Sequence, residues 1–198
     1  MSFDLVHDMQ TSYRKVIDSM SRPGLITNLC EEADKWDGDF PCFPATLTIA
    51  RLLLDSEVSF KVFTEKEADL NNLFNQLTFS KAAETDQADY IFVLQDARHG
   101  DLRNAIEKAK NGSLNDPHHS ATIVIETGGI SGENELKLMG PGIKGENFVK
   151  VQTSLDWMDI REERNAEYPL GIDLIFVDVD HHLLCLPRTV RVMKEETR

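Results

Sequence analysis

Two arginines stand in bends that a proline fixes, near opposite ends of the chain. They occur in the segments Ser21-Arg22-Pro23-Gly24 and Leu186-Pro187-Arg188-Thr189. The planar guanidinium group of arginine can bind two oxygens of a phosphate or phosphonate at once. Arg22 and Arg188 are therefore candidate anion-binding residues. The alternative is that each guanidinium binds helix carbonyls or pairs with one of the many carboxylates.

Asp173 is the third candidate for a ligand-binding role. It ends the segment Tyr168-Pro169-Leu170-Gly171-Ile172-Asp173. The proline restricts the backbone before this acid, and the acid lies at the start of a predicted apolar strand. An acid at such a place can act in catalysis or can cap a turn. No catalytic residue can be identified from the sequence alone.

The histidines form two doublets that raise the question of a metal site. These are His118-His119 and His181-His182, with Asp116, Asp178 and Asp180 nearby. Such residues can bind zinc or iron. In an extended chain, however, adjacent side chains point to opposite faces, so each doublet offers one ligand to a given site. Since polar residues are also common in turns, we expect solvated turns here and no metal site.

One stretch matches the glycine pattern of dinucleotide-binding sites. Gly140-Pro141-Gly142-Ile143-Lys144-Gly145 fits GxGxxG letter by letter. A dinucleotide site also needs a helix directly after the glycines, so that its N-terminus faces the pyrophosphate. Residues 146–151 show no helical periodicity. We therefore expect a structural turn rather than a Rossmann site.

The three cysteines offer little for catalysis. Their odd number and wide spacing favour reduced thiols over a disulfide framework. Cys185 lies in an apolar strand, where a thiol is usually inert, and Cys30 and Cys42 stand beside acids or prolines. We expect no cysteine nucleophile.

Helical and strand periodicities alternate along the chain. Apolar residues at three- and four-residue steps predict helices over 8–21, 44–54, 70–77, 102–109 and 155–164. Apolar runs predict strands over 25–29, 58–63, 90–94, 121–125, 136–139, 174–177 and 183–186. The last two strands are too close for a crossover helix, so they must be antiparallel. This pattern predicts a three-layer α/β/α fold with a mixed, mostly parallel sheet, formed by residues 1–198 as a single domain.

Composition limits the classes of partner. The 198 residues include 21 Lys and Arg against 34 Asp and Glu, a formal net charge of −13. Most of the surface would repel nucleic-acid phosphates, so an anion needs a local basic pocket. We find neither a secretory signal pattern nor a run of roughly 20 apolar residues. We therefore expect a cytoplasmic protein with no nucleic-acid or membrane partner.

Four segments, in order, resemble the PhnH family of carbon-phosphorus (C-P) lyase subunits. They are 21–24, 140–143, 168–176 and 186–189, so the resemblance spans nearly the whole chain. One segment departs from the family. Where the family has Pro-Glu-x-Gly-Ala-Thr, this chain has Pro117-His118-His119-Ser120-Ala121-Thr122, so no role of that glutamate or glycine is carried over.

The resemblance implies a part in bacterial phosphonate use, inside a complex with the subunits PhnG, PhnI and PhnJ. The step concerned makes ribose 1-phosphonate 5-triphosphate from ATP and a phosphonate such as methylphosphonate, with loss of adenine, while the C-P bond is cleaved elsewhere. The resemblance further implies that the subunit forms a homodimer when it is alone, and that it binds a ligand derived from ATP or from a phosphonate.

The family's fold is similar to the large domain of pyridoxal-phosphate (PLP) transferases, without the cofactor. The sequence agrees, because Lys137, a lysine within a predicted strand, alternates with Leu136 and Leu138. It should lie on the wetter face, unlike a Schiff-base lysine. Three hypotheses follow: a subunit without a cofactor, a stand-alone PLP-type transferase, or a purely structural scaffold.

Overall fold

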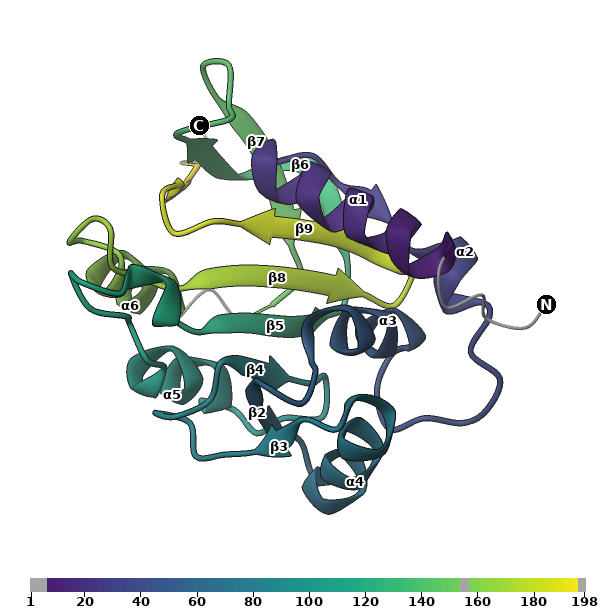
Figure 1. Ribbon diagram of the computed structural model, residues 1–198. Coiled ribbons are helices and arrows are strands. Elements are labelled where there is room, and N and C mark those ends of the chain that lie inside the picture. Colours follow the sequence, from purple (N-terminus) through teal and green to yellow (C-terminus); the bar gives the residue numbers. More distant parts are fainter. Residues whose placement is uncertain (1–6, 154–156, 196–198) are drawn as a thin grey trace.

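A seven-stranded sheet forms the centre of the computed structural model, which describes residues 7–153 and 157–195 (Figure 1). The strand order is β1-β9-β8-β5-β4-β2-β3. The bounds are β1 (Thr27–Asn28), β2 (Ser59–Phe63), β3 (Lys81–Ala82), β4 (Tyr90–Val93), β5 (Thr122–Thr127), β8 (Asp173–Asp178) and β9 (His182–Leu186). The strands from β3 to β8 are parallel, whereas β9 and β1 are antiparallel to their neighbours. The predicted mixed, mostly parallel α/β sheet is confirmed.

Helices cover both faces of this sheet. Their bounds are α1 (His7–Ser21), α2 (Cys30–Ala33), α3 (Pro44–Leu53), α4 (Glu67–Thr78), α5 (Asp101–Lys108) and α6 (Trp157–Arg164). Side chains of β4 and of Leu94, which follows it, alternate between two hydrophobic clusters, as the period of a strand requires. Ile91 and Val93 pack on the face of α5 and α6, while Phe92 and Leu94 pack on the face of α1, α3 and α4.

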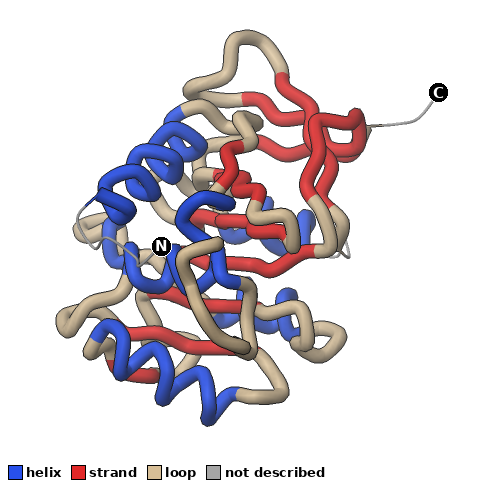
Figure 2. The backbone as a smooth tube through the Cα atoms, turned by 90° about the vertical axis from the view of Figure 1, so that its right-hand side faces the viewer, coloured by secondary structure: helices blue, strands red, loops and turns tan. Residues whose placement is uncertain are grey.

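A second, smaller sheet was mostly missed by the sequence prediction. It consists of β6 (Ile130–Met139), β7 (Asn147–Val151) and β10 (Arg191–Lys194) in the antiparallel order β10-β6-β7. In Figure 2 its strands lie at the upper right, apart from those of the large sheet. Its buried residues, such as Leu138 and Val149, join the core on the α5 and α6 face. Only the end of β6 was predicted, because β7 and β10 mix polar and apolar residues.

The GxGxxG stretch is the turn between β6 and β7. A strand, not a helix, follows it at Asn147, so the prediction of a structural turn is confirmed. Lys137 points to the face of β6 opposite that of the buried Leu136 and Leu138, also as predicted, and it forms an ion pair with Glu146.

The predicted hairpin at the end of the chain is confirmed as well. β8 and β9 are antiparallel, with Leu174 opposite Leu186. Of the predicted helix over 155–164, the first two residues lie outside the described part of the chain. None of the helices in the described ranges is long and apolar enough to cross a membrane.

Candidate functional site

Two of the three candidate residues, Arg188 and Asp173, bind each other. Asp173 begins β8 and Arg188 follows β9, so the hairpin brings both to the amino ends of the parallel strands. The backbone N–H of Arg188 donates to Oδ1 of Asp173 at 2.7 Å, and Nη2 donates to Oδ2 at 2.5 Å. Nε also donates to Oδ1, at 3.3 Å. The carboxylate alternative, left open by the sequence, is thus the observed one for Arg188.

Arg188 also reaches a third segment. Its Nη1 donates to the carbonyl oxygen of Pro117 at 3.0 Å. Pro117 begins the short 3-10 turn η1 (Pro117–His119). The side chain of Arg188 is 19% exposed and that of Asp173 is 18% exposed. The largely buried guanidinium of Arg188 therefore links the start of β8, the end of β9 and the turn η1 by hydrogen bonds.

Arg22 lies elsewhere. It forms an exposed ion pair with Asp18, one turn earlier in α1, at 2.6 Å. Within residues 7–153 and 157–195, no hydrogen bond or ion pair joins Arg22 to Arg188 or Asp173. The structure therefore gives Arg22 a different partner from that of Arg188.

The bend that carries Arg22 nevertheless packs on the turn between β6 and β7. Asn147 donates from Nδ2 to the carbonyl of Pro23 at 2.8 Å. A Cβ atom at Gly24 would come within 2.8 Å of the Asn147 side chain. A Cβ atom at Gly142 would come even closer to its neighbour, because it would overlap the carbonyl oxygen of Ser21. The glycines in these two segments are thus explained by close packing.

The remaining segments join the same cluster. A Cβ atom at Gly140 would lie 3.0 Å from the carbonyl oxygen of Thr189. One at Gly171 would lie 3.2 Å from Cβ of Arg188. All four segments that carry the family resemblance, although far apart in sequence, therefore form one contiguous region of the molecule. We call it the four-segment cluster.

A pocket of about 710 Å³ opens at the four-segment cluster. Three arginines line it, from α6, the segment after β9, and β10: Arg161, Arg188 and Arg191. Glu162 is the acid in its wall, and the exposed Tyr168 lies at its side. The remaining lining residues are Pro141, Met158, Asn165, Ala166, Leu170, Thr189, Val190, Val192 and Met193. This local excess of positive charge, in a protein of net charge −13, suits an anion.

Arg161 is the buried member of the three arginines, only 3% exposed. Its guanidinium donates to the carbonyls of Val190 at 3.1 Å, Pro187 at 2.8 Å and Leu186 at 3.4 Å. Burial lowers the pKa of Arg161 to about 10, against the opposing charge of Asp173. The side chain is therefore still protonated at neutral pH. Sequence reasoning missed it, because an arginine in a polar helix resembles a solvated one.

Glu126 is a second residue that sequence reasoning missed, at the opposite end of the sheet. Its Oε1 accepts hydrogen bonds from the Thr46 hydroxyl at 2.6 Å and the Phe43 N–H at 2.7 Å. Its Oε2 accepts one from the Gln95 N–H at 3.2 Å. Burial raises the pKa of Glu126, although these hydrogen bonds oppose the shift. Smaller pockets of about 320 and 380 Å³ border it.

Glu126 can be read in two ways. A buried carboxyl group with a raised pKa beside a pocket is a candidate acid or base. Its hydrogen bonds also tie the start of α3 to the end of β4, which is a structural role. The signal in the sequence was an acid near the end of an apolar strand.

The second histidine doublet lies in the β8–β9 turn, as predicted. Nδ1 of His182 lies 3.0 Å from Oδ2 of Asp178, a carboxylate that is buried and also accepts the N–H groups of Ile130 and Asp180. His182 begins β9 at the carboxyl ends of the parallel strands, whereas His118 and His119 precede β5 at their amino ends. The two doublets therefore do not meet.

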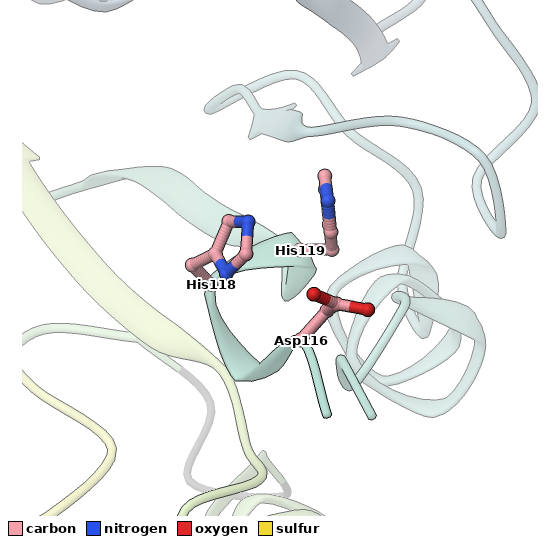
Figure 3. A group of neighbouring side chains, drawn as sticks. All are labelled: Asp116, His118 and His119. Atoms are coloured by element: carbon pink, nitrogen blue, oxygen red, sulfur yellow. The ribbon is translucent and has the colours of Figure 1, made fainter. Parts of the chain in front are cut away.

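The first doublet contradicts the expectation that adjacent histidines point apart. The ring centroids of His118 and His119 are only 4.2 Å from each other. The prediction assumed an extended chain, but these residues belong to the 3-10 turn η1, which does not alternate its side chains. Potential ligand atoms of Asp116, His118 and His119 all lie within 4.8 Å of one another (Figure 3).

The cysteines match the sequence interpretation. All three are free thiols. Burial raises the pKa of Cys185 to about 12 and also raises that of Cys42. Cys30 is exposed, and its pKa is raised by partial desolvation and by Asp34. Raised pKa values disfavour the thiolate, which is the nucleophilic form.

Comparison with known proteins bears on the four-segment cluster. Residues 2–193 match the family model described as bacterial phosphonate metabolism protein (PhnH). HtxG of Stutzerimonas stutzeri, assigned as a C-P lyase subunit, is 31% identical over 187 residues, which cover 92% of this chain and 85% of HtxG. The PhnH subunit of alpha-D-ribose 1-methylphosphonate 5-triphosphate synthase from Rhizobium meliloti (strain 1021) is 26% identical over 197 residues, covering 97% of this chain and 94% of that subunit. The sequence resemblance seen in four short segments thus extends along nearly the full length, and the chain belongs to the PhnH family of bacterial phosphonate metabolism proteins.

Proposed function

We propose that this chain is the PhnH-type subunit of a bacterial C-P lyase assembly. In this role it supports the formation of ribose 1-phosphonate 5-triphosphate from ATP and a phosphonate such as methylphosphonate. The observation that carries the proposal is the family match over residues 2–193. The names of the two relatives, one a C-P lyase subunit and the other a synthase subunit, support the particular step.

The pocket at the four-segment cluster is the part of the subunit that we assign to an anionic ligand. The reactants and product of this step carry phosphate or phosphonate groups, which arginines bind well. Arg161 and Arg188 are already engaged with protein oxygens. Arg191, exposed on β10, lines the pocket and makes no ion pair with another residue of the described ranges. Arg191 is therefore the side chain we expect to contact the ligand.

The partners we propose are PhnG, PhnI and PhnJ, with a homodimer when the subunit is alone. Exposed large apolar side chains support a contact surface near the pocket. Tyr168 is 80% exposed and Met193 is 42% exposed, and both line the pocket. Burial of exposed apolar groups of this size against a partner is favourable, because it removes apolar surface from water.

We propose that the subunit works without PLP, although its fold should be similar to that of PLP transferases. A Schiff-base lysine must lose its proton, which burial promotes. In the described ranges, every lysine is exposed or half-buried. The hydrogen bond with Glu146 raises the pKa of Lys137, which favours the protonated form. A visible absorbance band of the purified protein that borohydride removes would contradict this part of the proposal.

The test uses a tagged chain in phosphate-starved cells that grow on methylphosphonate. Mild lysis, affinity capture and mass measurement of the intact assembly should recover PhnG, PhnI and PhnJ. Failure to recover any of them would overturn the proposed function.

The role of the pocket is tested separately, by growth of a deletion strain that carries a variant chain. Arg191→Ala should slow growth on methylphosphonate while the assembly still forms. The matched control is Lys194→Ala, an exposed cation of the same strand that does not line the pocket. Equal growth of both strains would favour the hypothesis of a purely structural scaffold. The ion pair between Arg188 and Asp173 is also consistent with that hypothesis.

A further inference from the structure

The turn that precedes β5 carries three metal-binding side chains. Asp116, His118 and His119 present one carboxylate and two imidazoles, whose nearest potential ligand atoms lie within 4.8 Å of one another. Figure 3 shows the three side chains gathered at a single short turn. All three are exposed to solvent, so an ion can reach them without any opening of the fold.

The backbone of this turn is held firmly. The carbonyl of Pro117 accepts Nη1 of Arg188 at 3.0 Å, and the His119 N–H donates to the Asp116 carbonyl at 3.3 Å. Pro117 also packs on Gly112, where a Cβ atom would come within 2.9 Å of the Pro117 carbonyl oxygen. A β-bridge between Asn111 and Ser120 closes the loop. Such a fixed scaffold limits the entropy that its side chains lose when they bind an ion.

The three side chains themselves are uncommitted. In the described ranges, none of the three forms an ion pair. The rings of His118 and His119 contact each other. The other doublet differs, since Nδ1 of His182 lies 3.0 Å from Asp178. Ligand atoms without a protein partner need break no interaction in order to coordinate a metal. Small side-chain rotations, which exposure permits, bring them to coordination distance.

We propose that Asp116, His118 and His119 form a binding site for a late first-row divalent cation, with Zn²⁺ as its reference ion. Two imidazoles and one carboxylate are a ligand set that zinc accepts, with a fourth position open to solvent. Mg²⁺ and Ca²⁺ prefer oxygen ligands, so they bind here far more weakly. The ion adds positive charge at the turn that Arg188 holds. This proposal does not depend on the proposed function.

The experiment is a calorimetric titration of the full, untagged chain with ZnCl₂ in a buffer that does not bind metals. All proteins carry Cys30→Ser, because this exposed thiol is a competing ligand. We expect one equivalent of Zn²⁺ per chain. His118→Ala and His119→Ala should each weaken binding by roughly tenfold or more, since each removes one of three ligands. The control His99→Ala, an exposed histidine outside the turn, should bind as the parent does.

Cobalt provides a second, spectroscopic readout, because its visible absorption depends on the ligands around the ion. Co²⁺ bound at this site should give a visible absorption spectrum that is lost in His118→Ala and His119→Ala but kept in His99→Ala. Binding that is unchanged in the double variant of His118 and His119, or the lack of any stoichiometric site in the parent, would overturn the proposal. Because the three side chains are exposed, these variants should keep the thermal midpoint of the parent.

Discussion

Gly142 lies against the carbonyl oxygen of Ser21 so closely that a side chain at residue 142 would overlap this oxygen. The contact joins the turn between β6 and β7 to the end of α1. It places two segments that are far apart in sequence in direct contact within the four-segment cluster. The glycine also has a φ of +82°, which other residues rarely adopt.

Replacing this glycine should therefore destabilise the fold. We expect Gly142→Ala to lower the free energy of unfolding by about 3 kcal/mol, from the positive φ and from displacement of the Ser21 backbone. Gly145→Ala is the matched control, with a similar φ of +85° but open space around its Cβ position. It should cost about 1 kcal/mol. Urea unfolding of both variants measures the difference, and equal losses would contradict the contact.

The pair of Arg188 and Asp173 should be coupled in stability. We expect Arg188→Ala to cost about 2 to 3 kcal/mol, because it leaves a largely buried carboxylate without its guanidinium partner. Asp173→Ala should cost a similar amount. The double variant should be less destabilised than the sum of the two by roughly 1 to 2 kcal/mol. Chemical denaturation of the four proteins measures this coupling, and additive losses would show that the pair contributes nothing.

Arg161 should resist replacement even by lysine. A lysine ammonium cannot reach the carbonyls of Leu186, Pro187 and Val190 together, as the planar guanidinium does. We expect Arg161→Lys to lower the free energy of unfolding by about 2 kcal/mol. The same change at the exposed Arg103 should stay within about 0.5 kcal/mol. A small effect at both positions would mean that the buried hydrogen bonds of Arg161 are dispensable.

Glu126 should make stability depend on pH in a predictable direction. Because its pKa is raised above the ordinary value of 4.5, the folded state holds the proton to higher pH than the unfolded state does. The free energy of unfolding should therefore fall as pH rises from about 4.5 through the raised pKa. Glu126→Gln should lack this part of the decline. Urea midpoints of the two proteins between about pH 4 and pH 8 measure it.

A control separates Glu126 from the many other acids. The exposed Glu163, replaced by glutamine, should leave the pH profile as it is in the parent. Parallel profiles for the parent and Glu126→Gln would contradict the raised pKa of Glu126.

The large sheet could be predicted from sequence because its strands are covered on both faces. Residues 90–94 and 174–177 are uninterrupted apolar runs, and such runs have few alternative structures. The small sheet could not be predicted in the same way. β10 presents mostly exposed residues, with Val192 as its half-buried apolar contact, so its composition resembles that of a loop.

The candidate site was only partly predictable. Asp173 begins a strand and Arg188 follows one, as the sequence predicted, but their mutual bond depends on the register between β8 and β9. The pocket draws its walls from several distant segments, and no local pattern marks Arg161 or Arg191 as members. The first histidine doublet lies in a solvated turn, as expected, but its two rings lie side by side because the backbone there is not extended.

The two outer strands of the large sheet, β1 and β3, have only two residues each. Short edge strands offer few free main-chain groups, which protects a protein against edge-to-edge aggregation. A neighbouring polypeptide can therefore gain little by extending the large sheet with a strand of its own. Recognition between this chain and other proteins at those borders must rely on side-chain shape and charge.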